Sequence, residues 1–345
     1  MNSKINVLLT CASGPGGVSA VKSLKDHTRY RLFGVDSDPL SLGLYSKYLV
    51  DRYCVPPGDS SDYLTHIEEI VKKDDINIIF PMSDEEVTSL SQQKKQFEAM
   101  GVVIPIADYD VVSKADDKLV TIRIAEMSGI PVPRTIEFRN LDSLDFKKLT
   151  YPALIKPIYE RGGKGIEFVY NEDKLIEAYQ KLSPRYGTRL MIQEVIPGGR
   201  GSIHLFAGLY DRSGILKASF MSRSIRTKYE FGGPGEGGEP IVDEDLRKQS
   251  LTLLNAVGRW FGPVNVEFKR SSMTGKLMLL EINARYWGYS YLATAAGINF
   301  PLLTMKVAMG EEFPDQHDYR TDIITLKSTE HCVVNKRDLL RPIDF

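Results

Sequence analysis

Two acidic residues interrupt two short apolar segments in the last third of the chain, and this pattern constrains the fold more than any other. Glu267 lies in V-N-V-E-F and Glu281 in L-L-E-I-N-A-R, and the apolar neighbours of both predict β-strands. The stretch between them, residues 269–276, contains Ser, Thr and Gly and predicts a tight turn. On one antiparallel hairpin the two glutamates can face each other, and Asn283 shares the face of Glu281.

Opposed carboxylates repel each other unless a cation lies between them. Two carboxylates and an amide oxygen are hard ligands that suit Mg²⁺, which completes its coordination with water and phosphate oxygens. Arg285 follows two residues after Asn283 and is placed to reach a phosphate. The pattern therefore favours a metal–nucleotide site, although an amphipathic hairpin with solvent-facing acids would show the same spacing.

The composition indicates an ordinary globular protein with two or three packed units. The chain has 345 residues and a formal net charge of −1, whereas a dedicated nucleic-acid-binding protein shows a basic excess. No apolar segment approaches the ~20 residues of a membrane span, and the N-terminus lacks a signal-peptide pattern. Cys11, Cys54 and Cys332 lack metal-ligand spacing. We therefore expect a cytoplasmic protein that binds neither nucleic acid nor a membrane.

The first 113 residues alternate short apolar segments with helical patterns, which predicts a parallel, doubly wound sheet. The first predicted strand ends in Gly14-Pro15-Gly16-Gly17, and Asp36 follows the second. NAD binding is a weak alternative here, because the glycines depart from G-x-G-x-x-G and Pro15 removes a backbone donor. We expect instead a tight turn and a helix N-terminus that can hold an anion or a carboxylate.

The middle of the chain carries glycine-rich segments beside cations. Residues 161–166, Arg-Gly-Gly-Lys-Gly-Ile, predict a flexible cover for phosphates, although a simple turn has the same composition. Residues 193–196, Gln-Glu-Val-Ile, end a predicted strand, and their apolar side chains beside backbone polar groups could hold an adenine ring. Arg223 and Arg226 offer cations for a carboxylate substrate, and the glycines of residues 232–238 could fold over a bound ligand.

The order of these motifs resembles the ATP-grasp superfamily, in particular the branch of the carbamoyl-phosphate synthase large chain. Lys118, Lys156, R-G-G-K-G, Q-E-V-I-P-G-G, V-E-F and E-I-N-A-R follow one another within residues 7–310. The resemblance implies an α/β fold with an N-terminal Rossmann-like parallel domain, a small α+β lid and a C-terminal α+β domain with an antiparallel sheet. The expected N-terminal domain comprises residues 1–113, and a linker helix and strand follow at residues 114–150. The lid is expected at residues 151–197, the metal and substrate subdomain at 198–310 and a C-terminal segment at 311–345.

The resemblance also implies a role for each motif. The residues expected to bind ATP are Lys118, Lys156, Gly162, Gly163, Lys164, Gly165, Gln193, Glu194, Val195 and Ile196. The expected ligands of Mg²⁺, or of Mn²⁺, are Glu267, Glu281 and Asn283. Arg285 and Lys164 are the expected catalytic cations, and Arg223 and Arg226 the expected substrate-binding ones. One departure is that residues 199–204 contain no acid where many relatives hold the ribose hydroxyls with one.

The implied activity is that of an ATP- and Mg-dependent ligase, which activates a small carboxylic acid as an acylphosphate for attack by an amine and releases ADP. Phosphorylation of bicarbonate or carbamate is an alternative, although this chain carries one set of motifs and the synthase large chain carries two. A further alternative is a non-catalytic nucleotide-binding subunit, which would not need the metal ligands. The expected partners are a small-molecule acid and an amine, and a homodimer is compatible with the chain.

Overall fold

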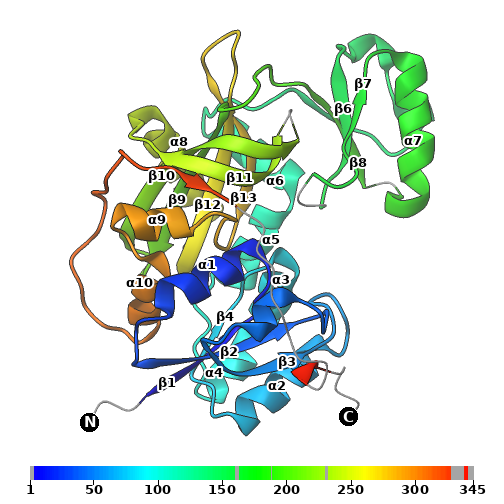
Figure 1. The fold of residues 1–345 in the computed structure, drawn as a ribbon. Helices are drawn as coiled ribbons and strands as arrows, with labels where there is room; N and C mark the ends of the chain where they lie inside the picture. Colours follow the sequence, from blue (N-terminus) through cyan, green and yellow to red (C-terminus); the bar gives the residue numbers. More distant parts are fainter. Residues whose placement is uncertain (1–3, 160–162, 188, 230–231, 328–337, 341–345) are drawn as a thin grey trace.

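The computed structural model describes residues 4–159, 163–187, 189–229, 232–327 and 338–340, and Figure 1 shows its fold. The described chain contains three β-sheets of four, six and four strands. One sheet is parallel and two are antiparallel, and helices pack against them. This α/β architecture confirms the predicted fold class.

The N-terminal sheet is parallel and has the order β3-β2-β1-β4. Its strands are β1 (Ile5–Leu9), β2 (Tyr30–Asp36), β3 (Leu49–Cys54) and β4 (Ile78–Phe80). Its helices are α1 (Pro15–Leu24), α2 (Tyr63–Lys73), α3 (Asp84–Gln92), α4 (Lys94–Ala99) and the short η1 (Leu42–Tyr45). Val7 and Leu9 share a hydrophobic cluster with α1 and Leu8 shares one with α2, so apolar contacts cover both faces of the buried strand β1.

Two helices, α5 (Tyr109–Asp116) and α6 (Lys118–Met127), lead away from this sheet. Asp117 lies between them and caps α6, because its Oδ1 accepts hydrogen bonds from the backbone N–H groups of Leu119 at 2.9 Å and Val120 at 3.0 Å. The cap makes Lys118 the first residue of α6. The position of this lysine is therefore determined by a helix boundary rather than by a loop.

The small sheet has the order β5-β8-β6-β7 and packs against one long helix. Its elements are β5 (Thr135–Glu137), η2 (Leu141–Ser143), η3 (Phe146–Lys148), β6 (Ala153–Pro157), β7 (Glu167–Val169), α7 (Glu172–Tyr186) and β8 (Leu190–Glu194). Ile155, Val169, Leu175 and Ile192 belong to a hydrophobic cluster that contains only residues of this unit. Figure 1 shows the unit set apart from the other two sheets. The domain boundaries proposed from the sequence stay a prediction.

The large sheet is antiparallel and has the order β13-β12-β9-β10-β11-β14. Its strands are β9 (Ile203–Tyr210), β10 (Leu216–Tyr229), β11 (Gly232–Pro240), β12 (Gly262–Arg270), β13 (Leu277–Asn283) and β14 (Thr325–Leu326). The accompanying helices are α8 (Glu244–Val257), α9 (Tyr291–Ala296) and α10 (Phe300–Ala308). The predicted acidic hairpin is β12–β13, and Glu267 lies opposite Glu281 in it.

The glycine-rich residues 232–238, expected to fold over a ligand, form part of strand β11 instead. A Cβ atom on Gly235 or Gly238 would come within 2.5 Å or 2.7 Å of the Tyr289 ring, and one on Gly237 would come within 2.9 Å of the Thr325 carbonyl oxygen. The glycines therefore allow an aromatic ring and the strand β14 to pack closely against β11.

The parallel sheet and the large sheet share continuous hydrophobic clusters. One cluster joins Ile67 and Leu90 to Val264 and Leu279, and these residues come from helices of the first unit and strands of the last. The first and last units therefore pack against each other through apolar side chains, whereas the small unit has a core of its own. Within the described part of the chain, no helix has the length and apolar character needed to cross a membrane.

We predict that Gly262→Ala destabilises the protein more than Gly275→Ala does. Both glycines have a left-handed backbone, with φ of 82° and 69°, so alanine costs about 1 kcal/mol at either site. At Gly262 the added Cβ would also overlap the Pro105 carbonyl oxygen, whereas at Gly275 no heavy atom lies within 4 Å. Urea unfolding of the two variants measures the difference, and equal losses would contradict the steric argument.

Candidate active site

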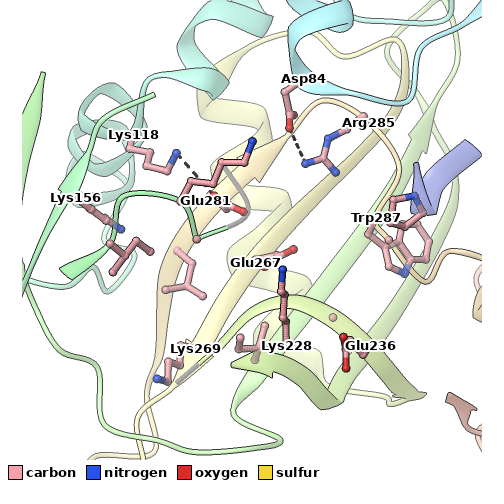
Figure 2. A pocket seen from close by; sticks show the side chains of 18 of the residues that line it. Asp84, Lys118, Lys156, Lys228, Glu236, Glu267, Lys269, Glu281, Arg285 and Trp287 are labelled. Atoms are coloured by element: carbon pink, nitrogen blue, oxygen red, sulfur yellow. Dashed lines mark hydrogen bonds and ion pairs between the residues drawn. The ribbon is translucent and has the colours of Figure 1, made fainter. Parts of the chain in front are cut away.

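A cavity of about 620 Å³ is lined by residues of all three units (Figure 2). Most of the side chains predicted from the sequence lie on its wall, namely Lys118, Lys156, Gly163, Lys164, Gln193, Glu194, Val195, Ile196, Glu267, Glu281 and Arg285. Gly165, Asn283, Arg223 and Arg226 are not among the lining residues, and Gly162 lies outside the described part of the chain. Segments that are distant in the sequence, such as those of Lys118 and Arg285, therefore meet at one cavity.

The opposed glutamates of β12 and β13 form the floor of the cavity. Burial, followed by the negative charge of Glu281, raises the pKa of Glu267 well above its usual range, and the Arg285 guanidinium opposes this shift. Among the described residues no group of three or more His, Cys, Asp and Glu side chains could hold a metal ion. A cation bound between the two glutamates would relieve their repulsion, and it would need further oxygen ligands from an amide, water or phosphate.

Asn283 is the amide nearest to this pair. Its Nδ2 donates hydrogen bonds to Asn265 Oδ1 at 3.2 Å and to Glu281 Oε1 at 3.5 Å, and its Oδ1 accepts one from Arg285 Nη2 at 3.2 Å. Asn265, which is fully buried on β12, also donates to the Arg285 carbonyl oxygen at 2.8 Å. These bonds hold Glu281, Asn283 and Arg285 in one arrangement. The donor set fits a Mg²⁺ ion if the amide oxygen turns from Arg285 to the metal.

Two lysines approach the glutamates from the side of the small sheet (Figure 2). Lys118 Nζ lies 3.9 Å from Glu281 Oε2, and both side chains are largely buried. Burial, together with the positive charge of Lys118, lowers the pKa of Lys156 to about 8, although the charge of Glu281 raises it. Two buried ammonium groups that repel each other favour a bound anion, so this part of the cavity suits a phosphate chain.

Arg285 bridges the last unit to the first. Its Nη2 lies 2.6 Å from Asp84 Oδ2 and its Nη1 donates to the Tyr286 carbonyl oxygen at 2.8 Å. Burial would lower the pKa of Arg285, but the charge and hydrogen bond of Asp84 raise it above its usual value. The sequence analysis missed Asp84. Its signal is an acid at the start of the helix that follows the buried parallel strand β4, because ligand sites of such sheets lie beyond the carboxyl ends of the strands.

Three charged residues outside the predicted set also line the cavity: Lys228 of β10, Glu236 of β11 and Lys327 directly after β14. Figure 2 shows Lys228 pointing toward Glu267. The Lys327 N–H donates to the Glu236 carbonyl oxygen at 2.7 Å, which brings the C-terminal segment to the cavity. The two arginines predicted to bind the substrate do not line the cavity and instead form ion pairs. Arg226 Nε lies 3.1 Å from Glu236 Oε2, and Arg223 pairs with Glu239.

The predicted adenine-binding segment begins with the last two residues of β8, a strand that lies between β5 and β6 in the small sheet. Glu194 Oε1 accepts a hydrogen bond from the Arg134 backbone N–H at 2.9 Å, and Gln193 Nε2 donates to Thr135 Oγ1 at 2.9 Å. Both side chains therefore tie β8 to β5. Val195 and Ile196 line the cavity directly after them.

Comparison with known families matches both ends of the chain. Residues 8–105 match the family described as PylC-like, N-terminal domain. Residues 237–332 match the family described as ATP-grasp in the biosynthetic pathway with Ter operon. The second match covers Glu267, Glu281 and Arg285, which lie on the cavity floor.

Similar sequences include carbamoyl phosphate synthase large chains. The chain from Xanthomonas campestris is 24% identical over 94% of this chain and 30% of its own length. The N-terminal section of the large chain from Aquifex aeolicus is 23% identical over 89% of this chain and 58% of its own length. This chain therefore spans about a third of the full-length synthase chain and somewhat more than half of the separate N-terminal section.

Similar solved structures share the fold at low sequence identity. The biotin carboxylase domain dimer of 2-oxoglutarate carboxylase from Hydrogenobacter thermophilus, in complex with MgADP and bicarbonate, has a TM-score of 0.73 and 16% identity over 92% of this chain and 73% of that chain. The L-amino acid ligase from Bacillus licheniformis has a TM-score of 0.69 and 17% identity over 90% of this chain and 75% of that chain. These likenesses establish the fold.

The loop that carries Asp84 is held by a buried acid. Glu86 Oε2 accepts hydrogen bonds from Thr10 Oγ1 at 2.5 Å and from the Ser83 N–H at 3.2 Å, and Ser83 Oγ accepts from the Glu86 N–H at 3.4 Å. This reciprocal pair caps the N-terminus of α3. Burial raises the pKa of Glu86 to about 7, although the hydrogen bonds from Thr10 and Ser83 lower it.

We predict that Glu86→Gln reduces the pH dependence of folding stability. The pKa of this carboxyl group is 4.5 in the unfolded chain and about 7 in the folded protein. Between these two pH values the group is therefore protonated in the folded protein and ionised in the unfolded chain. The free energy of unfolding of the unmodified protein should therefore fall as the pH rises from about 4.5 to about 7. Urea unfolding across this range checks the slope, which the variant should flatten. Identical slopes for the two proteins would contradict the buried, protonated glutamate.

Proposed function

We propose that this chain, which belongs to the ATP-grasp superfamily and is related to the carbamoyl phosphate synthase large chain, is an ATP- and Mg-dependent ligase. It would activate a carboxylic acid as an acylphosphate with release of ADP, and an amine would then displace inorganic phosphate to form an amide. One observation carries the proposal: two lysines and two opposed carboxylates, from separate units, converge on one cavity.

The metal would be held by Glu267, Glu281 and Asn283. Mg²⁺ supplies positive charge that links the carboxylates to the phosphate oxygens of ATP. Arg285 would turn from Asp84 to the transferring phosphoryl group, where its planar guanidinium neutralises charge that develops during transfer. The side chain needs no new backbone position for this change, because its carbonyl oxygen stays bound to Asn265.

The nucleotide would lie between the small sheet and the large sheet. Lys118 and Lys156 would bind the phosphates, with Lys156 nearest the α- and β-phosphates, and Lys164 would approach from the loop before β7. The adenine would lie against Val195 and Ile196. Because the Glu194 and Gln193 side chains already bind β5, the polar contacts to the adenine edge would come from the backbone of this segment.

The acid substrate would be bound by Lys228 and Lys327. Both line the cavity, whereas Arg223 and Arg226 pair with glutamates and do not line it. A carboxylate between Lys228 and Arg285 would lie beside the metal site, where the phosphoryl group is transferred. We therefore propose the two lysines in place of the two arginines as the cations that select the acid.

Phosphorylation of bicarbonate or carbamate is a second candidate, favoured by the synthase relatives. A non-catalytic nucleotide-binding subunit is a weaker one, because it would not require two opposed carboxylates on the cavity floor. ADP release from Mg-ATP, measured with pools of carboxylic acids and with pools of alkylamines and amino acids, separates the three. The ligase requires both an acid and an amine, the second candidate responds to bicarbonate alone, and the third responds to no pool although ATP binds.

We predict that Glu281→Gln lowers turnover at least ~100-fold, because it removes a metal ligand and the charge that the metal neutralises. The fold should persist, since the change also removes the repulsion with Glu267. ADP release and Mn²⁺ binding in the presence of ATP measure the effect. Glu177→Gln on α7, whose exposed side chain pairs with Lys174, is the control and should change neither. Full activity of Glu281→Gln would remove the metal assignment.

We predict that Lys228→Ala raises the KM for the acid substrate roughly 10-fold or more and leaves the KM for ATP nearly unchanged, because one charge-assisted hydrogen bond is lost. Arg223→Ala, which removes a cation of the same strand outside the cavity wall, is the matched control and should retain both constants. If Arg223→Ala or Arg226→Ala raises the KM for the acid and Lys228→Ala does not, the arginines bind the acid and the lysine proposal fails.

A further inference from the structure

The cavity continues beyond Arg285 toward the N-terminal unit. Its wall there includes Cys11, Pro15, Met82 and Trp287, and Ser83 and Asp84 are the polar residues among them. Figure 2 shows Arg285 between Asp84, which lies above it, and Trp287, which lies on the side away from Lys156. This end of the cavity therefore combines apolar side chains with one carboxylate and one hydroxyl group, and it lies next to the proposed site of phosphoryl transfer.

We infer that this end of the cavity binds the amine acceptor and that Asp84 accepts its ammonium group. The inference rests on the proposed ligase function and names the substrate class of its second site: a primary amine with a compact apolar body. An aliphatic amine carries a positive charge near neutral pH, because its pKa is close to that of lysine, about 10.4. The ammonium group must lose a proton before its nitrogen can attack the acylphosphate carbonyl; the Asp84 carboxylate would accept that proton, and inorganic phosphate would leave as the amide forms.

The other acids on the cavity wall are engaged elsewhere. Glu267 and Glu281 face each other across the proposed metal site, Glu194 accepts the Arg134 N–H, and Glu236 pairs with Arg226. Asp84 pairs with Arg285, which is the cation assigned to the phosphoryl group. When Arg285 turns toward that group, the Asp84 carboxylate loses this cation and an ammonium ion can replace it. Substrate ammonium and Arg285 would thus alternate at the same carboxylate.

The setting of Asp84 favours a strong interaction with a cation. Its side chain is 13% exposed, and a carboxylate in so dry a position binds a positive group more strongly than it would in water. Its backbone is fixed by the Glu86–Ser83 cap and by the hydrogen bond from the Met82 N–H to Thr10 Oγ1 at 3.3 Å. The carboxylate therefore has a defined position before a ligand binds.

The apolar wall limits the size of the amine. Met82 and Trp287 are nearly fully buried at 5% and 3% exposure. The N-terminal unit approaches the last unit closely here, since a Cβ on Gly288 would lie 3.4 Å from Pro15 Cβ. A short alkyl group would be covered by this wall, whereas a second positive charge would find no carboxylate there besides Asp84 among the described lining residues.

Asp84 could instead act only by orienting Arg285, and the two roles predict different partial reactions. Hydroxylamine is largely uncharged near neutral pH and converts an acylphosphate to a hydroxamate without an ammonium site. Asp84→Asn should leave hydroxamate formation from acid and Mg-ATP close to that of the unmodified protein. With alkylamines as nucleophiles, the same variant should raise the KM for the amine roughly 10- to 100-fold, the usual cost of a lost charge-assisted hydrogen bond.

The matched control is Glu85→Gln, which removes one negative charge from the next residue of α3 and lies outside the cavity wall. It should alter neither reaction. If Asp84→Asn lowers hydroxamate and amide formation equally, Asp84 only positions Arg285 and the inference is overturned. If Asp84→Asn does not fold, Asp84→Glu replaces it, and the longer side chain should raise the KM for alkylamines while hydroxamate formation persists.

Failure of the ligase proposal is recognised separately. In that case the unmodified protein forms neither hydroxamate nor amide with any acid of the pool, and the inference falls with it. If the unmodified protein forms hydroxamate but accepts only amines that carry a carboxylate or a second cation, the ligase proposal stands and the compact apolar amine is wrong.

Discussion

The repulsion between Glu267 and Glu281 is the constraint on which the rest of the site depends. Their register in the β12–β13 hairpin holds the two carboxylates together, and the surrounding apolar strands prevent water from fully screening them. In the protein without a bound cation, burial and this repulsion raise the pKa of Glu267. Lys118, Lys156 and Arg285 surround the pair, so the site combines an acidic floor with cationic walls. That combination suits a metal ion and a phosphate chain bound together, and neither alone would satisfy it.

The packing of the three units explains how such a site can be both rigid and accessible. The first and last units share hydrophobic clusters, and the Asp84–Arg285 ion pair crosses between them at the cavity. The small unit has its own core and contributes Lys156, Lys164 and the segment after β8. The groups proposed for metal and acceptor binding therefore lie on the jointly packed part, and the groups proposed for the nucleotide lie mainly on the separate part.

Short-range pattern predicted much of this arrangement. Alternation of apolar and polar residues gave the register of Glu267 and Glu281, and strand–helix alternation predicted the parallel sheet. Lys327 could not be found in this way, because it reaches the cavity through a contact with Glu236, a residue distant in the sequence. Local pattern also failed for β11, because its glycines by themselves indicate a flexible loop. Their role in close packing becomes clear only from the position of the Tyr289 ring in the folded protein.

The most direct test of the account is a crystal structure with Mg²⁺ and a non-hydrolysable ATP analogue. The account predicts a metal between the carboxylates of Glu267 and Glu281, phosphates within hydrogen-bonding distance of Lys118 and Lys156, and Arg285 turned from Asp84 toward the γ-phosphate. A nucleotide bound elsewhere, or bound in this cavity with its metal away from both glutamates, would contradict it.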